Sequence, residues 1–305
     1  MRRLYYIIKP ILPRRLQIFL RRWAINYKKP KYANIWPIDE KAGKKPSDWN
    51  GWPDNKKFAL VLTHDVDTVL GHDKCLNLIA LEQSLDFVSS FNFVAERYVV
   101  SHELRQHITS IGFEVGVHGL YHDGKLYESK EVFKERAVRI NQYIKDWGAV
   151  GFRSPSMHHN LDWIHELNIE YDASTFDTDP FEPQPDGVNT IFPFYVKSKS
   201  DNKGYVELPY TLPQDFTLFV LMGEKDIKIW KRKLDWIAEH GGMALLNTHP
   251  DYMNFNIDKH SIEEYPAQYY LEFLEYVQHK YKDHYWHGLP KDIARFYARN
   301  LGQNL

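Results

Sequence analysis

Residues 58–67 read FALVLTHDVD, in which a run of five apolar residues is followed, after Thr63 and His64, by Asp65 and Asp67. A short apolar run that ends in polar residues is typical of a buried strand. Two carboxylates at the end of such a strand are costly to desolvate unless a metal ion or a proton balances their charge. Taken alone the pair is weak evidence, since an isolated D-x-D more often caps a helix or faces solvent.

The same pattern continues beyond this stretch, with short apolar runs alternating with longer amphipathic segments. Such alternation predicts parallel strands covered by helices, hence an α/β fold. The expected strands are 58–63, 91–95, 113–117, 149–152, 169–173, 191–195, 205–208 and 243–247. The expected helices are 74–90, 103–111, 130–147, 161–167, 226–239, 262–281 and 290–300.

The composition narrows the classes of protein and of metal site. The 305 residues include 39 Lys and Arg against 40 Asp and Glu, which excludes a nucleic-acid-binding protein held by bulk positive charge. With 43% hydrophobic residues, the chain can bury a large core and is not disordered. Cys75 is the single cysteine, so any metal ion must be held by Asp, Glu or the 15 His.

The charge is distributed unevenly along the chain. Residues 1–31 contain ten Lys or Arg and no acid, which leaves 29 basic and 40 acidic residues in the remainder. Helical spacing over 16–27 predicts a basic amphipathic helix. Such a helix can dock on the acidic body of its own chain or lie on an anionic membrane surface, and both interpretations stay open. Its apolar residues are Leu16, Phe19, Leu20, Trp23, Ala24 and Tyr27, and its basic residues are Arg14, Arg15, Arg21 and Arg22.

We expect two parts: a basic arm with an extended linker over 1–53, and a body over 54–305. The apolar run 4–8 is broken by Lys9 and Pro10 and no small-residue cleavage site follows, so we expect no secretory signal peptide. No stretch approaches the roughly 20 apolar residues of a membrane span. These features predict a cytoplasmic protein, with a peripheral contact at the inner membrane face through residues 1–31 as a further expectation.

Further polar residues follow the later strands. An H-x-x-x-H pair comes after strand 113–117, and its two imidazoles could reach one Zn²⁺. An Arg two residues before a Pro, an Asp, and finally a His end other apolar runs, each modest evidence when taken singly. Because the carboxyl ends of parallel barrel strands meet at one end of a barrel, these side chains are expected to gather there. They are His118 and His122, then Arg153, Ser156, Asp172 and His249.

The ordered series of D-x-D, H-x-x-x-H, R-x-P, Asp and His over residues 58 to about 250 resembles the NodB-homology polysaccharide deacetylases, carbohydrate esterase family 4. The resemblance implies a distorted, incomplete (β/α)7 barrel with a C-terminal helical extension. It also implies a metal-dependent hydrolase that removes acyl groups, N-acetyl above all, from amino sugars. The substrate expected on this basis is a glycan, and binding of the basic arm to anionic lipid would predict a lipid-linked sugar precursor.

Residue by residue, the resemblance implies that Asp65 is the general base and that Asp67, His118 and His122 are the metal ligands. The expected metal is Zn²⁺, with Co²⁺, Ni²⁺ and Fe²⁺ as alternatives. The D-x-D spacing departs from the adjacent Asp-Asp of the common motif and occurs in a subset of the family.

The remaining roles are implied in the same way. Arg153 is expected to hold the base carboxylate, Asp172 to orient the catalytic His249, and the backbone N–H of Ser156 to bind the oxyanion. Ser156 stands where the family usually has Tyr, and Asn247 stands where it usually has a Leu that lines the acetyl pocket. Asn247 is therefore a candidate substrate-binding residue that puts the acyl group in question.

The loops after these motifs are expected to overhang the barrel mouth, where His158, His159 and Trp163 are candidates for contact with a sugar. Two other functions stay open. One is an amidohydrolase that acts on a non-sugar C–N bond, such as that of a cyclic imide or ureide. The other is a carbohydrate-binding protein that keeps the barrel and has lost turnover.

Overall fold

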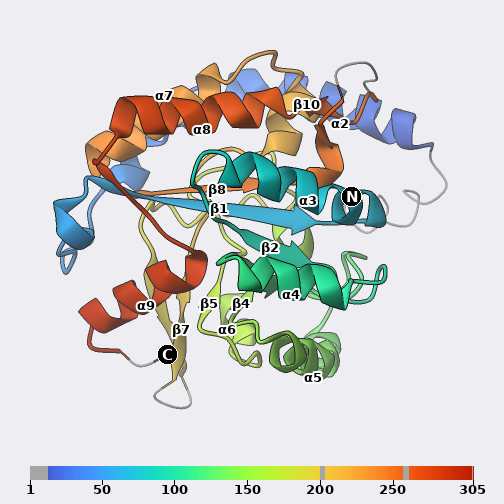
Figure 1. Ribbon diagram of the computed structural model, residues 1–305, viewed down its shortest axis with the longest axis vertical. Helices are drawn as coiled ribbons and strands as arrows, with labels where there is room; N and C mark the ends of the chain where they lie inside the picture. The colour runs from blue at the N-terminus through green and yellow to red at the C-terminus, as the bar shows by residue number, and fades with distance from the viewer. Residues whose placement is uncertain (1–12, 200–202, 257–260, 304) are drawn as a thin grey trace.

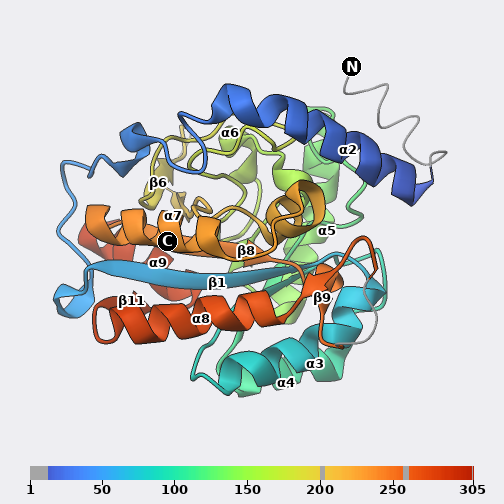
Figure 2. The same cartoon turned by 90° about the horizontal axis from the view of Figure 1, so that it is seen from above.

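The computed structural model describes residues 13–199, 203–256, 261–303 and 305. A curled, mostly parallel sheet occupies the centre, with helices packed around its outer face (Figures 1 and 2). The predicted α/β class is therefore confirmed. Residues 1–12, the start of the predicted basic arm, lie outside the described residues.

Seven parallel strands form the body of the described sheet, in the order β8-β1-β2-β3-β4-β5-β7. β6 pairs antiparallel with β7 at one edge, and β11 extends the parallel sheet beside the first residues of β1. The strands are β1 (Phe58–Val66), β2 (Ser90–Phe93), β3 (Glu114–Val117), β4 (Gly151–Phe152), β5 (Tyr171–Asp172), β6 (Phe194–Lys197), β7 (Gly204–Glu207), β8 (Met243–Thr248) and β11 (Tyr285–His287), with a separate parallel pair β9 (Met253–Asn254) and β10 (Tyr265–Pro266).

The sheet closes into a distorted barrel through a segment that is too irregular to be a strand. Leu212 forms a parallel bridge with Leu246 of β8, and the backbone N–H groups of Thr211 and Leu212 both donate to the carbonyl of Leu245, at 3.0 and 3.1 Å. A single bridge in place of a full strand leaves the barrel incomplete at this seam. The resemblance implied this distortion, and the observed sheet agrees with it.

The helices cover the sheet on the outside. α7 and α8 run side by side over β1 and β8, while α3, α4 and α5 follow the next strands around the barrel (Figures 1 and 2). The bounds are α2 (Arg14–Lys28), α3 (Val69–Gln83), α4 (His102–Ser110), α5 (Lys130–Trp147), α6 (Leu161–Ile164), α7 (Lys228–His240), α8 (Gln268–Tyr281) and α9 (Pro290–Asn300), with a π-helix η5 (Phe216–Met222) and short 3₁₀ turns η1 (Lys29–Tyr32), η2 (Glu40–Gly43), η3 (Pro53–Asn55), η4 (Pro155–Met157) and η6 (Pro250–Tyr252).

Local capping explains where several helices begin and end. The Ser129 hydroxyl accepts from the N–H of Val132 to start α5, and Gly148 ends it in the left-handed region with φ 62°. The helix expected over 74–90 is wrong at both ends. α3 begins at Val69 because Thr68 caps it, and it stops at Gln83, before strand β2.

The helix expected over 262–281 is also shorter than predicted, since Tyr265–Pro266 forms β10 and α8 begins only at Gln268. The C-terminal extension closes the end of the barrel opposite the carboxyl ends of its strands. Ile293 and Tyr297 of α9 pack against Ala59 and Val61, which point to the barrel interior. That end is filled with apolar side chains, so the opposite end is left for a site.

All nine residues of β1 are buried. Leu60 and Leu62 pack with the outer helices, whereas Ala59 and Val61 belong to the interior cluster, as the alternation of side chains along a strand requires. This double burial is why the strand reads as a continuous apolar run.

The basic arm is docked on the body. Ile18 and Ile25 of α2 are buried, and the Nε of Arg22 donates to the carbonyl of Val220 in η5 at 2.8 Å. The guanidinium of Arg21 lies 4.7 Å from the ring centre of Phe216. The docked interpretation is thus confirmed for residues 14–28, with arginines on the protein side of the helix.

The connection expected to be an extended linker contributes to the core. Trp36 and Ala42 are buried with the outer helices, and the indole N–H of Trp52 donates to the carbonyl of Gly241 at 2.9 Å. Within the described residues, no helix has both the length and the apolar character needed to cross a bilayer.

Candidate metal centre and active site

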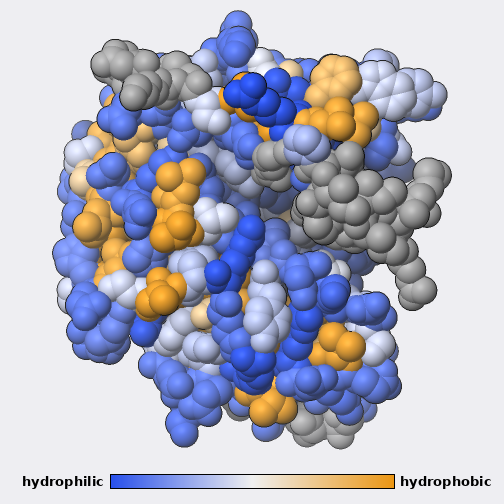
Figure 3. Space-filling view, turned by 90° about the vertical axis from the view of Figure 1, so that its right-hand side faces the viewer, coloured by the Kyte–Doolittle hydropathy of each residue, from blue (hydrophilic) through white to orange (hydrophobic). Residues whose placement is uncertain are grey.

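The sequence-predicted side chains gather where the carboxyl ends of the parallel strands meet. Asp65 and Asp67 end β1, His118 follows β3, Arg153 follows β4 and His249 follows β8. The arrow of β1 points to the right in Figure 1, so Figure 3 looks onto this end of the barrel. In a barrel of parallel strands this is the end at which active sites are built.

Asp67, His118 and His122 form a compact group that could hold a metal ion. Asp67 Oδ1 lies 3.5 Å from His118 Nε2 and 3.3 Å from His122 Nε2, and one ligand atom from each residue lies within 4.8 Å of the other two. Ligand atoms about 2.1 Å from a tetrahedral Zn²⁺ lie about 3.4 Å apart, which matches both distances. Asp67 Oδ1 is also buried without a hydrogen-bond donor among the described residues, as expected for an oxygen reserved for a cation.

The protonation states of these groups suit a metal. Burial lowers the pKa of His122 to about 4, so its imidazole is neutral and keeps a lone pair at neutral pH. Burial alone would raise the pKa of Asp67, but the nearby imidazoles of His122 and His118 outweigh it and lower that pKa. His118 Nδ1 lies 3.0 Å from the carbonyl oxygen of Arg153, an acceptor that directs Nε2 toward the site.

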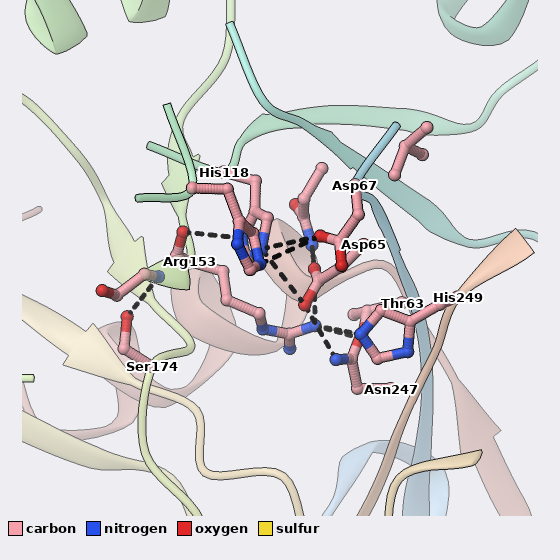
Figure 4. A network of polar contacts seen from close by, with 12 residues as sticks. Thr63, Asp65, Asp67, His118, Arg153, Ser174, Asn247 and His249 are labelled. Carbon is pink, nitrogen blue, oxygen red and sulfur yellow. Dashed lines mark hydrogen bonds and ion pairs between the residues drawn. The ribbon is translucent and has the colours of Figure 1, made fainter. Parts of the chain in front are cut away.

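Asp65 is held from three sides by hydrogen-bond donors (Figure 4). Asn92 Nδ2 and Arg153 Nη1 approach Oδ1 at 3.0 and 3.3 Å, and Asn247 Nδ2 donates to Oδ2 at 2.8 Å. Burial would raise the pKa of Asp65, but the nearby His118 and Arg153 lower it below its ordinary value. The expected contact between Arg153 and Asp65 is present, and the carboxylate is kept ionised.

The sequence reasoning missed Asn92, which sits in β2 between two phenylalanines. Its amide fits beside Asp65 because the facing residue of β3 is a glycine. A Cβ on Gly116 would lie 2.1 Å from Asn92 Oδ1, so no larger residue leaves room. A polar side chain inside a short apolar strand, opposite a glycine, is the signal that could have identified it.

His249 is paired with Asp215, and the prediction that Asp172 orients it is wrong. His249 Nδ1 lies 2.7 Å from Asp215 Oδ1, and the backbone N–H of His249 donates to Asp215 Oδ2 at 2.8 Å. The hydroxyl of Tyr265 donates to the same Oδ2 at 2.9 Å. Asp215 immediately precedes η5, a segment with no strand or α-helical pattern in the sequence, so nothing in the residue order pointed to it.

Asp172 stabilises a different part of the site. Its Oδ1 accepts from the hydroxyl of Ser174 at 2.6 Å, and the same hydroxyl accepts from the backbone N–H of Ser154 at 2.8 Å. Burial raises the pKa of Asp172, and Glu207 is its buried neighbour. Asp172 therefore fixes the backbone that follows Arg153.

The pKa of His249 is shifted in the direction opposite to that of His122. Burial acts to lower it, but the carboxylate of Asp215, together with Asp67 and Asp65, raises the pKa of His249 to about 10. At neutral pH the imidazole carries a proton that it can donate. The ionised carboxylate of Asp65 and the protonated imidazole of His249 thus flank the same candidate metal-binding group, and their pKa values are shifted in opposite directions.

Comparison with solved structures identifies the architecture. A scan against protein-family models and a search of curated proteins both gave no match for this sequence. A putative polysaccharide deacetylase from Mycobacterium smegmatis matches with a TM-score of 0.63 at 18% sequence identity, over 85% of this chain and 96% of that one. The chain has the polysaccharide deacetylase fold. The predicted fold is confirmed.

Two further structures agree in fold. A probable polysaccharide deacetylase from Pseudomonas aeruginosa PAO1 has a TM-score of 0.60 at 17% identity, over 87% of this chain and 98% of that one. The Puue allantoinase has a TM-score of 0.61 at 15% identity, with the same coverage of 87% and 98%. The polysaccharide deacetylase fold therefore spans the body of this chain rather than a part of it.

Within this deacetylase fold, the prediction that Asn247 binds substrate does not agree with the structure. Asn247 is fully buried in β8. Besides its bond to Asp65, its Oδ1 accepts from Arg153 Nη1 at 2.5 Å and from the hydroxyl of Thr63 at 3.2 Å (Figure 4). Its side chain holds Asp65 and Arg153 in place, and leaves no polar atom for a ligand.

The loop that carries Ser156 lies next to the metal-binding group in the deacetylase fold. Ser156 adopts a left-handed φ of 58° in the turn after Pro155. His158 and His122 line the same small cavity beside this turn. The oxyanion role of the Ser156 N–H and the substrate contact of His158 remain predictions.

His159 and Trp163 are engaged by the protein itself. His159 Nδ1 lies 3.0 Å from the carbonyl of Met157, and the backbone N–H of His159 donates to Gln184 Oε1 at 3.2 Å. Trp163 stacks on Tyr127, with ring centres 6.0 Å apart, and packs against a core cluster under α5. Trp163 is thus a packing residue rather than a free platform for a sugar.

Proposed function

We propose that this chain is a metal-dependent hydrolase that removes an acyl group, N-acetyl in the first instance, from a carbohydrate or a lipid-linked glycan precursor. One observation carries the proposal. The three metal-binding side chains are flanked by an ionised carboxylate, Asp65, and by a protonated imidazole, His249, at the open end of the barrel. The deacetylase fold of the neighbouring structures supports it.

Asp67 Oδ1 and the Nε2 atoms of His118 and His122 are the atoms that would hold the metal, with Zn²⁺ expected first and Co²⁺, Ni²⁺ or Fe²⁺ as alternatives. Such an ion supplies Lewis acidity, which lowers the pKa of water and polarises a carbonyl oxygen. The protein supplies ligands that are already in the required protonation state, so little charge has to be rearranged on binding.

Asp65 would take a proton from the attacking water while the new C–O bond forms at the amide carbon. Its donors Asn92, Arg153 and Asn247 hold the carboxylate in one orientation and leave it a weak base. A weak base suffices only for a water that is already acidified, and for this reason the proposed role of Asp65 depends on the neighbouring metal-binding group.

His249 would donate its proton to the leaving nitrogen as the C–N bond breaks, releasing a carboxylic acid and an amine. Asp215 keeps the imidazole protonated until that moment. The backbone N–H of Ser156 is the proposed donor to the oxyanion that forms between the two steps.

A second candidate substrate class is a non-sugar C–N bond, such as that of a cyclic ureide. The Puue allantoinase shares the fold. In addition, the position at which the resemblance places an apolar pocket residue carries Asn247, here turned to the base. The same base, acid and metal-binding group would serve either substrate.

The test is release of acetate from a panel of N- and O-acetylated saccharides by metal-loaded protein, with allantoin as the non-sugar comparison. We expect acetate release that is abolished by a chelator, restored by Zn²⁺ or Co²⁺, and lost in His118→Ala. The matched control is His107→Ala, a surface histidine of α4, which should retain full activity.

Turnover of allantoin without acetate release would transfer the proposal to the second substrate class. Equal rates for wild type and His118→Ala would refute the metal-dependent mechanism. Glycan binding that resists the chelator, with no product from any substrate, would instead identify a binding protein.

A further inference from the structure

The outward side of α2 carries five large apolar or aromatic side chains in contact with solvent. We propose that this outer α2 face, defined by these five residues, docks on an anionic membrane surface. The inference goes beyond the proposed hydrolysis and does not depend on it. The residues, with their exposed fractions, are Leu16 (41%), Phe19 (63%), Leu20 (43%), Trp23 (65%) and Tyr27 (62%).

α2 differs from an ordinary surface helix because most of its large apolar side chains face solvent. Arg21 and Arg22 face the protein, where they contact Phe216 and the carbonyl of Val220, and only Ile18 and Ile25 are buried apolar anchors. Turning aromatic residues to water while arginines cover the body is unfavourable unless the aromatic side meets another apolar phase. The hydrogen bonds of Arg22 to Val220 and to the carbonyl of Ile262 hold the helix in this orientation.

The charge beside the face identifies the occupant. Residues 13–31 include seven Lys or Arg and no acid. Arg15 and Lys28 are exposed on α2 itself, and the ammonium of Lys31 lies 4.2 Å from the ring centre of Tyr27. Apolar and aromatic side chains flanked by cations suit the boundary between anionic headgroups and acyl chains. A second copy of the same face would bring like charges together, whereas an anionic lipid surface would attract them.

The surface continues beyond the helix. Ile262, 43% exposed, adjoins α2 through the hydrogen bond that its carbonyl accepts from Arg22. Figure 3 shows apolar and strongly basic side chains next to one another along the upper edge of the molecule, where α2 lies in Figure 1. Both kinds of side chain are thus presented on one side of the protein.

The docking surface and the active site share η5. α2 rests on this π-helix, and Asp215, which precedes it, holds His249. The ring of Tyr252 lies 4.6 Å from that of Phe216 and 5.4 Å from that of His249. A protein docked through α2 therefore places its proposed acid close to the lipid-facing side, where a lipid-linked substrate would arrive.

The test is co-sedimentation of the full chain with vesicles made of equal parts of phosphatidylglycerol and phosphatidylcholine, and with pure phosphatidylcholine vesicles. We expect binding to the anionic vesicles that weakens with added salt. The double variant Phe19→Gln, Trp23→Gln should lower the association constant for vesicles at least about tenfold, because it removes the favourable free energy of moving two aromatic side chains from water into the membrane interface.

The matched control is Val99→Gln, Val138→Gln, which removes two apolar residues that are even more exposed than Phe19 and Trp23, at 89% and 71%, and that lie outside α2. It should bind vesicles like wild type. A second double variant, Arg15→Gln, Lys28→Gln, should reduce the preference for anionic over neutral vesicles by about tenfold.

Several results would overturn the proposal. These are absence of vesicle binding by the full chain, unchanged binding by the Phe19→Gln, Trp23→Gln variant, and equal binding to both vesicle types. A concentration-dependent dimer of wild type that the same variant converts to a monomer, without any vesicle binding, would assign the face to a second copy instead. Because none of these measurements uses turnover, failure of the hydrolase proposal leaves the test intact.

Discussion

Two halves of the candidate site, the proposed metal ligands and the proposed acid with its partner, are held by different kinds of structure. Asp67 and His118 lie at or just after the ends of β1 and β3, and their position follows from strands that are legible in the sequence. His249 also follows a strand, but its partner Asp215 lies before an irregular π-helix, 34 residues away along the chain. Ligands fixed by one sheet can be predicted from its pattern, whereas a pair joined across two elements depends on how those elements pack.

The largest expected effect comes from removing a proposed metal ligand. Asp67→Asn keeps the shape of the side chain but removes the charge that a divalent cation requires. We expect loss of bound metal and a fall in kcat of about a thousandfold or more. Metal analysis of the purified variant and the rate of acetate release measure the two effects. Normal metal content with lost activity would contradict the assignment of Asp67 as a ligand.

The next effect lies in the acid half. His249→Ala should lower kcat by about a hundredfold to a thousandfold because the leaving nitrogen loses its proton donor. Metal content should stay that of wild type, since His249 is not one of the three grouped ligands. A parallel fall in metal content would show that the two halves are not independent.

Asp215→Asn is expected to change the pH dependence of kcat. As the proposed acid, His249 would act in its protonated form, so activity should fall as the pH rises through its pKa, which Asp215 helps to raise to about 10. Without that carboxylate the pKa of His249 falls toward its ordinary value of about 6.5, and the basic limb of the kcat profile moves to lower pH. The pH–rate profile measures the shift, and we also expect roughly tenfold lower kcat at neutral pH.

Asp172→Asn is the matched control for that variant. Asp172 contacts Ser174 and not His249, so its substitution should leave the basic limb in place. If Asp172→Asn moved the limb and Asp215→Asn did not, the original sequence-based assignment would be restored.

The smallest effect concerns the asparagine that joins the base to its arginine. Asn247→Leu installs the residue that the resemblance places at this position, and it removes a donor to Asp65 and an acceptor for Arg153. Leaving buried partners unpaired should reduce the free energy of unfolding by about 1–3 kcal/mol. Chemical denaturation measures this loss, with Ser47→Ala, at an exposed turn position, as a control. Unchanged stability together with a changed acyl preference would favour the substrate-binding role.

Much of the site was predictable because it follows a regular strand pattern. The run before Asp65 predicted a buried strand, and His118, Arg153 and His249 follow apolar runs in the same manner. Asn92 was missed because its function depends on the empty space beside Gly116, which belongs to a different strand. The partner of His249 was misassigned because the resemblance implied that Asp172 orients this histidine, whereas its observed partner Asp215 precedes η5, a segment with no strand or α-helical pattern.

Element boundaries show the same limit. The apolar periodicity of residues 262–281 predicted one helix, but Tyr265 and Pro266 pair with β9 instead. β11 was not expected at all. Its three residues pair with the start of β1, and a segment of three residues is too short to show a periodic pattern. Pairing of this kind is decided by what lies next to a segment in space, which local propensity does not encode.

The sequence by itself determined the α/β class, the order of the chemical side chains and the basic excess of the first 31 residues, because periodicity, residue type and charge are properties of the chain alone. Only the tertiary structure decided that Asp215 rather than Asp172 holds His249, and that Asn247 turns to the base. It also decided which side of α2 faces out, with Trp23 exposed and Arg22 bonded to η5. Each of these depends on close contacts between segments distant in sequence, where distance and burial select one partner from several with the same chemistry.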